Sequence, residues 1–532
     1  MHLIASNRKE AGFAIAAAMT AAALYAVFAP LEWTGLIWVA LAPLWAVARC
    51  VPERQALRLT AWAGFVFWAL SLRWLTHVTV LGWLGLSGCC ALFMLPSAMV
   101  SARWRGGPLG FGVLMAGVWC GAEAFRGWIG GGFPWNTLAA GLTPWRFAVQ
   151  SAEWIGASGV SAMVAFVNAL VAWGLAAAMG APNRTRSGRA MLEAGTALAL
   201  VAALLLWGVH RAAQLETEPP ARPLRVALIQ PSIPQDEKWV ESKTKMIYSR
   251  LNQLTRQAFQ GPWHPDLVVW PETAVPDDVR SSETSHGLMA RLCYVGRTPI
   301  LLGSLDTLIS DDGDRSYYNA AILFDSKGAL DGIYYKRHLV PMGEYIPLAG
   351  RLSLETRLRW GLPPDITPGT DGTLLHIGPN RIPASPLICF EDILPALARR
   401  DVRNGARILF NLTNDAWFDD VAAPRQHMRN AVLRAVENRV PLVRCANTGI
   451  SCFIDRTGRI TRQWVDPQSG STSAPGVLQG EADVPPDGMP LTFHTRFGDI
   501  VGVVCAMVTA LWLLAPVLHL RAVRSKAPRV AP

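Results

Sequence analysis

The 532-residue sequence contains few charged side chains for its length. Charged residues make up 17% of the chain, while 51% of the residues are hydrophobic. A typical soluble protein carries about 25% charged residues. The shortage of charge therefore excludes an ordinary soluble protein and predicts that part of the chain lies in a membrane.

The sequence also lacks the usual metal and nucleotide motifs. Its nine cysteines form no CxxC pair and no Cys/His cluster with zinc-like spacing, and no Walker loop occurs. We therefore expect no metal and no cofactor. The odd number of cysteines leaves at least one free thiol. Whether Cys445 and Cys452 form a disulfide is left open by the sequence.

The net charge of +10 is high enough to raise the question of a nucleic-acid partner. Much of the excess, however, lies in short loops beside apolar runs. Basic residues in that position are a membrane-topology signal. We therefore expect no nucleic-acid partner.

Eight apolar runs are each near the roughly 20 residues needed to cross a bilayer. They cover residues 11–29, 34–50, 60–76, 79–101, 108–125, 157–179, 191–209 and 499–520. This pattern predicts an α-helical membrane bundle of about eight transmembrane helices, seven in a domain at 1–213 and one in a C-terminal segment at 498–532. Because basic residues alternate between successive loops, the positive-inside rule places both termini in the cytoplasm and the segment between the last two runs on the opposite side.

That segment, 214–497, has a different pattern. Short β-rich runs occur at 224–230, 267–270, 300–305, 317–324, 333–335, 386–390, 408–412 and 442–445. Helical patterns separate several of them, including one at 425–438 with apolar residues at helical spacing. Alternating strands and helices predict a separate layered α/β domain.

Three chemically reactive residues lie at or near the ends of these β-rich runs: Glu272, Lys336 and Cys389. A thiol requires a base or a positive charge to become a good nucleophile, and a carboxylate and an amine can supply both. Taken singly, each also suits a structural role, as a turn carboxylate, a surface lysine and a buried cysteine. The residue types alone leave both interpretations open.

The motifs around these residues resemble a known family. They are Trp270-Pro-Glu272, Tyr335-Lys336 followed by Pro341-Met-Gly-Glu-Tyr345, and Ile388-Cys389-Phe-Glu391. In this order they look like the three signatures of the nitrilase (carbon–nitrogen hydrolase) superfamily. Together with the apolar runs, the resemblance covers essentially the whole chain and narrows to the apolipoprotein N-acyltransferase family. It implies an extracytoplasmic αββα sandwich with a catalytic triad, in which Glu272 is the base, Lys336 stabilises the thiolate and oxyanion, and Cys389 is the nucleophile.

The resemblance also implies supporting residues, namely Glu344, Glu391 and Trp239. Phe390 departs from the family pattern, because tyrosine commonly follows the nucleophile, and we regard it as a candidate lipid contact. Leu358 and Trp360 are further candidates, since they lie in an Arg/Leu/Trp-rich segment at 351–363 that could dip into the headgroup region as a lid. An ordinary amphipathic surface helix is the alternative for that segment.

The activity that the resemblance implies is a two-step acyl transfer. An sn-1 acyl chain of a phospholipid, typically phosphatidylethanolamine, would pass through a Cys389 thioester to the α-amino group of a diacylglyceryl-cysteine at the N-terminus of an apolipoprotein. This would be the last step of lipoprotein maturation, in the bacterial inner membrane with the catalytic domain in the periplasm.

Two other functions stay open. One is a membrane-tethered amidase or nitrilase that hydrolyses a small C–N substrate, and the other is a transporter or receptor with a non-catalytic domain. The many apparent spans favour the acyltransferase over the hydrolase, which needs one anchor at most. The scarcity of ionisable residues within the spans weakens the transporter.

Overall fold

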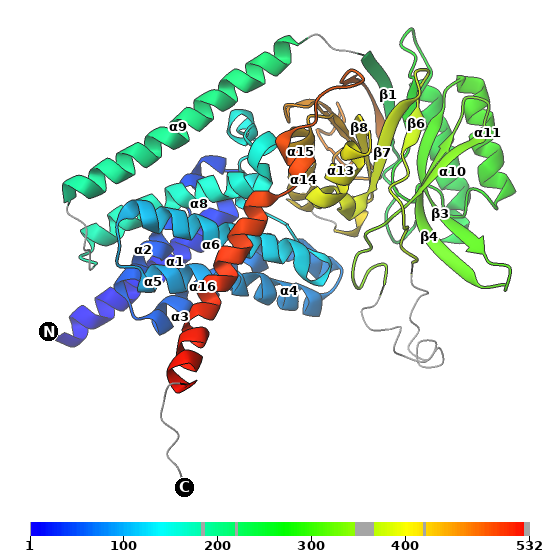
Figure 1. Cartoon of the computed structure of the whole chain (residues 1–532). Coiled ribbons are helices and arrows are strands. Elements are labelled where there is room, and N and C mark those ends of the chain that lie inside the picture. Colours follow the sequence, from blue (N-terminus) through cyan, green and yellow to red (C-terminus); the bar gives the residue numbers. More distant parts are fainter. Residues whose placement is uncertain (1, 182–186, 219–221, 346–365, 419–421, 526–532) are drawn as a thin grey trace. The chain divides into compact units, whose positions relative to one another are not determined.

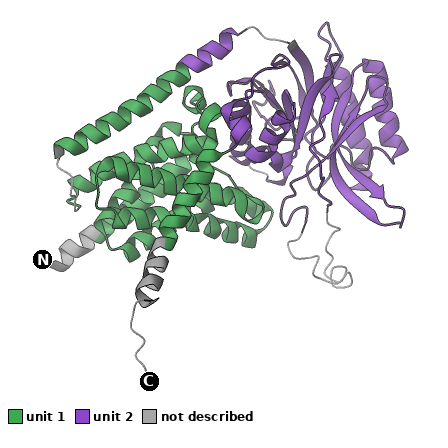
Figure 2. Ribbon diagram, in the orientation of Figure 1, with its two compact units in different colours: residues 1–209, 499–532 green, residues 210–498 purple. Residues whose placement is uncertain are grey.

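The computed structural model describes residues 2–181, 187–218, 222–345, 366–418 and 422–525, and the statements below concern these residues. Contacts divide the chain into two compact units (Figure 2). One comprises residues 1–209 and 499–532, and the other comprises residues 210–498.

The first unit is built of helices (Figure 1). Its longer members are α1 (His2–Val27), α2 (Ala42–Cys50), α3 (Glu53–Ser71), α4 (Val80–Leu92), α5 (Leu95–Arg103), α6 (Pro108–Trp128), α8 (Ala152–Ala178), α9 (Ser187–Thr217, which continues into the second unit) and α16 (Ile500–Ser525). Glycine lets two of them approach closely: a Cβ at Gly121 of α6 would lie 2.5 Å from the carbonyl oxygen of Cys505 in α16. Small residues at helix crossings are typical of membrane bundles.

Five segments of the described chain are long and apolar enough to cross a membrane. They are Glu10–Val27, Val80–Arg103, Pro108–Gly131, Ala152–Ala178 and Gly188–Thr217, and Thr34–Cys50 and Ile500–Leu514 are shorter apolar helices. The apolar run at 60–76 contributes to α3, which also contains Glu53, Arg54 and Arg58 and is not among the five. The predicted helical membrane bundle is confirmed, and five of the eight apolar runs form full-length candidate spans within the described residues.

The second unit contains two six-stranded sheets. The first has the order β12 (Gly476–Val484), β1 (Arg222–Gln230), β2 (Leu267–Val269), β3 (Ile300–Ile309), β4 (Arg315–Phe324) and β5 (Leu330–Tyr335). The second has the order β11 (Ile460–Gln463), β10 (Cys452–Ile454), β9 (Leu442–Ala446), β8 (Ile408–Thr413), β7 (Ile382–Ile388) and β6 (Leu375–Ile377). Strands β1, β2 and β3 are parallel, and so are β7, β8 and β9.

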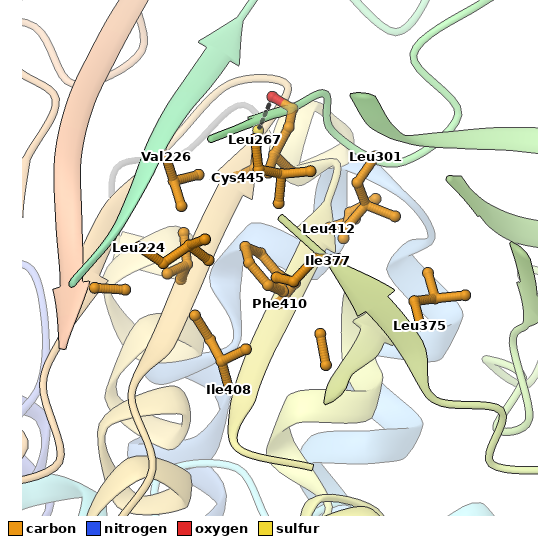
Figure 3. Close-up of a cluster of buried hydrophobic side chains, with 14 of the residues drawn as sticks. Leu224, Val226, Leu267, Leu301, Leu375, Ile377, Ile408, Phe410, Leu412 and Cys445 are labelled. Carbon is orange, nitrogen blue, oxygen red and sulfur yellow. Dashed lines mark hydrogen bonds between the residues drawn. The ribbon is translucent and has the colours of Figure 1, made fainter. Parts of the chain in front are cut away.

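Side-chain alternation along the strands produces the layers. Leu224 and Val226 of β1 join Phe410 of β8 in the core between the two sheets (Figure 3), whereas Ala227 and Ile229 of β1 belong to a cluster on the opposite face of the first sheet. Successive residues of a strand point to opposite faces, so one strand supplies both cores.

Helices cover the outer face of each sheet. Helices α10 (Thr244–Ala258) and α11 (Glu283–Gly296) supply apolar side chains to the cluster on the first sheet. Helices α13 (Pro395–Arg403) and α14 (Ala422–Asn438) do the same on the second sheet. The predicted αββα sandwich is therefore confirmed, and it buries both faces of each sheet.

All eight β-rich runs predicted from the sequence form strands, and the helix predicted at 425–438 lies within α14. The run at 386–390 ends earlier than predicted, because Cys389 and Phe390 begin a 3₁₀ helix, η7 (Cys389–Ile393). Strands β6, β10, β11 and β12 were not predicted. Three of these are sheet edges, where exposed polar residues interrupt the apolar pattern.

Candidate active site

Strand direction brings Glu272 and Lys336 to the same end of the first sheet. Strands β3 and β5 both run antiparallel to β4, so β5 points the same way as β2. Glu272 lies three residues beyond the end of β2, and Lys336 follows β5 directly. Cys389 follows the last residue of β7 in the second sheet. Turns after strand ends can present side chains without disturbing the sheets that hold them.

Glu272 has one anchored and one available carboxylate oxygen. Its Oε1 accepts hydrogen bonds from Asn319 Nδ2 at 2.8 Å and from Lys336 Nζ at 3.4 Å. Its Oε2 has no hydrogen-bond partner among the described residues. The side chain is buried. The carboxylate is thus held in place while one oxygen remains able to accept a proton.

Lys336 is almost completely buried, with 1% of its surface exposed. Its Nζ donates to Glu344 Oε1 at 2.8 Å and to Glu272 Oε1 at 3.4 Å. Burial by itself lowers the pKa of the amine, but the nearby carboxylates outweigh burial and raise the pKa well above its ordinary value. Lys336 is therefore a permanent positive charge, and one of its three N–H donors is left for another acceptor.

Glu344 completes this ion cluster. Its Oε1 accepts from Lys336 Nζ and, at 3.0 Å, from Asn319 Nδ2, while its Oε2 accepts from the backbone N–H of Val340 at 2.9 Å. Burial acts to raise the pKa of this carboxyl, but Lys336 and the hydrogen bonds outweigh burial and lower the pKa. Asn319 thus joins two carboxylates, and its position on β4 sets their spacing.

Cys389 lies on a strained turn, as the first residue of η7 directly after β7. Its φ of +51° falls in the left-handed region that residues other than glycine seldom adopt. Its carbonyl oxygen accepts from Asn411 Nδ2 at 2.9 Å, and the same amide donates to the carbonyl of Leu387 at 3.0 Å. The side chain is partly exposed. This geometry ends the strand and holds Cys389 just beyond the C-terminal end of β7.

The electrostatic surroundings keep the Cys389 thiol protonated at rest. Burial is the largest influence and Glu272 the next, and both raise the pKa, while Lys336 opposes them. The net result is a pKa well above the ordinary value. A nucleophilic thiolate therefore has to be generated by proton transfer to a base.

Glu391 connects the two segments that carry Lys336 and Cys389. It is fully buried, and its carboxylate accepts four hydrogen bonds. The donors are Tyr334 Oη (2.7 Å), Ile388 N (2.8 Å), Arg337 N (2.8 Å) and His338 N (3.1 Å). The carboxylate thus fixes the backbone beside both Lys336 and Cys389. Burial raises its pKa, partly offset by these bonds.

A second buried network supports the turn that carries Cys389. Arg444 of β9 donates to Asn411 Oδ1 at 2.7 Å, to Asp392 Oδ2 at 3.0 Å and to Asp415 Oδ2 at 2.8 Å. His427 bridges the same two aspartates, at 2.7 Å and 3.2 Å. Burial and Arg444 lower the pKa of His427, but the two carboxylates outweigh them and raise it. Because Asn411 holds the Cys389 carbonyl, the network supports the turn. In the sequence, this network is indicated by Arg444, a charged residue inside the apolar run Leu442-Val-Arg-Cys-Ala446.

Lys238 is a further site residue that the motifs did not reveal. It is buried, and its Nζ donates to Thr273 Oγ1 at 2.6 Å and to the backbone carbonyl of Glu272 at 3.2 Å. Trp239, which the resemblance suggested, is 48% exposed, and its ring centre lies 5.8 Å from Lys238 Nζ. In the sequence, Lys238 lies in the strongly polar run Gln235-Asp-Glu-Lys-Trp239. A polar run of this kind indicates a solvated surface, so it did not predict that Lys238 is buried.

Phe390 is partly buried in η7. Leu358 and Trp360 lie outside the described residues.

No group of three or more His, Cys, Asp or Glu side chains in the described part of the chain could hold a metal ion. Cys445 and Cys452 are free, and the Cys445 thiol donates to the carbonyl of Val269 at 3.3 Å (Figure 3).

Two six-stranded sheets between helical layers, with a carboxylate, a lysine and a cysteine at the strand ends, define a domain of the nitrilase (carbon–nitrogen hydrolase) class. Residues 225–480 match the family described as carbon-nitrogen hydrolase, and residues 20–170 match the one described as apolipoprotein N-acyltransferase N-terminal domain. The solved structure of Saccharomyces cerevisiae Nit3, a member of branch 10 of the nitrilase superfamily, is similar over 49% of this chain and 90% of that chain at 21% identity. Its TM-score of 0.36 is too low to define a shared fold by itself.

Two named relatives match most of the chain. The apolipoprotein N-acyltransferase of Geobacter metallireducens is 35% identical over 518 residues, which cover 91% of this chain and 92% of that protein. The protein of the same name from Brucella melitensis biotype 1 is 33% identical over 424 residues, which cover 76% and 77%. The chain belongs to the apolipoprotein N-acyltransferase family and is an acyltransferase, so the resemblance carried by the three motifs is confirmed.

Proposed function

We propose that the enzyme transfers an sn-1 acyl chain from a phospholipid to the α-amino group of an N-terminal diacylglyceryl-cysteine, by a ping-pong reaction through a Cys389 thioester. The observation that carries this proposal is the buried ion cluster of Glu272, Lys336 and Glu344, whose charges act on the thiol of Cys389 on a strained turn. Family membership supports a lipoprotein acceptor, a phospholipid donor and a membrane setting. Phosphatidylethanolamine is the donor that we propose.

In the first half-reaction, the free oxygen of Glu272 takes the proton from the Cys389 thiol as the sulfur attacks the ester carbonyl carbon. The negative charge that develops on the carbonyl oxygen is stabilised by the remaining N–H donor of Lys336. The tetrahedral intermediate then collapses, the C–O bond to glycerol breaks, and Glu272 returns its proton to the leaving oxygen. Lysophospholipid departs and a thioester stays on Cys389.

In the second half-reaction, the neutral amine of the acceptor attacks the thioester carbon. A C–N bond forms, the C–S bond breaks, and Glu272 passes the proton lost by the amine to the departing sulfur. The site is then back in its resting protonation state. Two easier steps replace one difficult transfer, provided that water is kept from the thioester.

We also propose a location for each part of the chain. Residues 1–213 form the membrane domain, 214–497 the catalytic domain, and 498–532 the C-terminal helix and tail. The alternation of basic residues between successive loops supports cytoplasmic termini and a periplasmic catalytic domain in the bacterial inner membrane. Phe390, Leu358 and Trp360 are the lipid contacts that we propose, and Glu344, Glu391 and Trp239 are the supporting residues of the active site.

A labelled donor tests the proposed function. Purified full-length protein is incubated with a phospholipid that carries a labelled sn-1 acyl chain. We expect a hydroxylamine-labile label on Cys389 that a diacylglyceryl-peptide amine discharges. Cys389→Ala abolishes the label, whereas Cys89→Ala, which removes an exposed free thiol of the membrane unit, retains it. Lys336→Ala lowers the rate by about 10²–10³-fold, as expected for the loss of an oxyanion donor.

The alternative, hydrolysis of a small amide, makes a different prediction. It expects water to release the acyl group as fast as the peptide amine does, and no preference for a lipid donor. Absence of label on Cys389 in a preparation that produces triacylated peptide would refute the thioester. Release by water at the same rate would refute the acyl transfer.

A further inference from the structure

The turn that carries Glu272 is held from two sides. Thr273 has a φ of +42°, a conformation that is costly for a β-branched residue. On one side, Gly303 of β3 lies so close that its N–H donates to the Pro271 carbonyl at 3.1 Å. On the other side, the Lys238 ammonium donates to the Thr273 hydroxyl and to the Glu272 carbonyl. Lys238 therefore bonds to the two residues whose backbone sets the direction of the Glu272 side chain.

Lys238 also belongs to the charge balance around the thiol. Both Glu272 and Cys389 interact electrostatically with its amine, although burial is the larger influence and lowers the pKa of Lys238 to about 8. With Lys238 charged, Glu272 interacts electrostatically with a second cation in addition to Lys336, with which it forms an ion pair. Without that charge, a Cys389 thiolate would form in a site that already has an excess of negative charge.

We propose that Lys238 is a positioning residue of the acyltransferase site, which holds the Glu272 turn and supplies a second positive charge that favours the Cys389 thiolate. The inference rests on the proposed function, because it assigns Lys238 a part in the activation of the same nucleophile. Lys238 acts in addition to Lys336, whose charge is paired directly with two carboxylates.

Alkylation of Cys389 by iodoacetamide measures the thiolate without a lipid substrate. The rate is followed on the full-length protein by mass spectrometry of the Cys389 peptide, from about pH 6.5 to about pH 9.5, on either side of the Lys238 pKa. The groups that also act on this thiol are Glu272, Lys336, Glu344 and Asp415, and none of them is altered in the variants.

Lys238→Met is expected to react about tenfold more slowly than the unmodified protein at the acid end of this range, which corresponds to a shift of about one pKa unit in the thiol. The difference should vanish at the alkaline end, because the Lys238 amine is then neutral in the unmodified protein as well. Lys238→Arg, whose charge is permanent, should keep the faster rate at both ends.

Two further variants separate charge from structure. Thr273→Val removes one hydrogen-bond acceptor of Lys238 and keeps the Lys238 charge. It should therefore leave the pH profile of Cys389 alkylation unchanged while slowing acyl transfer. Lys243→Met is the matched control, because Lys243 lies nearby in the sequence, pairs with Glu237 at 2.8 Å and should change neither measurement.

The charge assignment would be overturned if the ratio of the alkylation rates of the unmodified protein and Lys238→Met were constant across this pH range. A ratio of one at every pH would overturn it as well. Normal acyl transfer by Thr273→Val would overturn the positioning assignment. Failure of the unmodified protein to form an acyl-thioester would instead refute the proposed function, and it would leave the alkylation result standing.

Discussion

Replacement of Gly303 by alanine tests how tightly the fold sets the position of Glu272. A Cβ at this position would lie 2.6 Å from Glu272 Cα and 2.6 Å from the Pro271 carbonyl oxygen. Both are backbone atoms, and ordinary contacts begin at 3.4 Å, so the Glu272 turn has to move by about 0.8 Å. A misplacement of about 1 Å can cost about 10²-fold in rate, or about 2.7 kcal/mol of transition-state stabilisation.

The assay is the turnover of labelled phospholipid into triacylated peptide, with thermal unfolding of the same preparation as a measure of folding. We expect Gly303→Ala to lose about 10²-fold in kcat/KM and about 1–3 kcal/mol in unfolding free energy. Gly287→Ala in α11 is the matched control, since a Cβ there meets nothing within 4 Å. A folded Gly303→Ala variant with activity within about threefold of normal would refute the argument that this contact positions Glu272.

Arg444→Met should lower the unfolding free energy by about 3–5 kcal/mol, because Asp392 and Asp415 would lose their buried cation, and an unchanged thermal midpoint would contradict this. Glu344→Gln tests the pH dependence. The pKa of Glu344 is lowered from 4.5 in the fold, so its stabilisation is present above pH 4.5 and is lost as the pH falls through the folded pKa. The difference in thermal midpoint between the unmodified protein and Glu344→Gln should therefore be largest near neutral pH and shrink in acid. A difference that grows in acid would show that the Lys336 pair is not its source.

Much of the catalytic domain could be predicted from the sequence, because buried strands are apolar. The runs at 224–230 and 408–412 are apolar on both faces, as expected for strands covered by a second sheet on one side and helices on the other. The edge strand β12 was missed because its exposed positions are polar. The end of β7 was predicted two residues too late, because nothing in its residue types shows that Cys389 adopts a left-handed φ.

The residues of the candidate site divide in the same way, into those that the local sequence predicts and those that only the fold reveals. Glu272, Lys336 and Cys389 could be predicted as candidates because their motifs are local, with each residue close to a strand end. Lys238 was missed because its environment is not local: it is polar in sequence, yet the fold buries it against Thr273, which lies 35 residues away. Asn319 was missed for the same reason, since nothing around it in β4 indicates that its amide contacts two carboxylates.

The sequence by itself determined the helical membrane bundle and the layered α/β domain and predicted the candidate reactive residues, since periodicity and short motifs are properties of neighbouring residues. Only the tertiary structure decided how those residues behave. It raised the pKa of Lys336 and of the Cys389 thiol, lowered the pKa of Lys238 and put Glu391 between the two segments that carry Lys336 and Cys389. The physical reason is that burial and charge pairing depend on which distant segments the folded chain brings together.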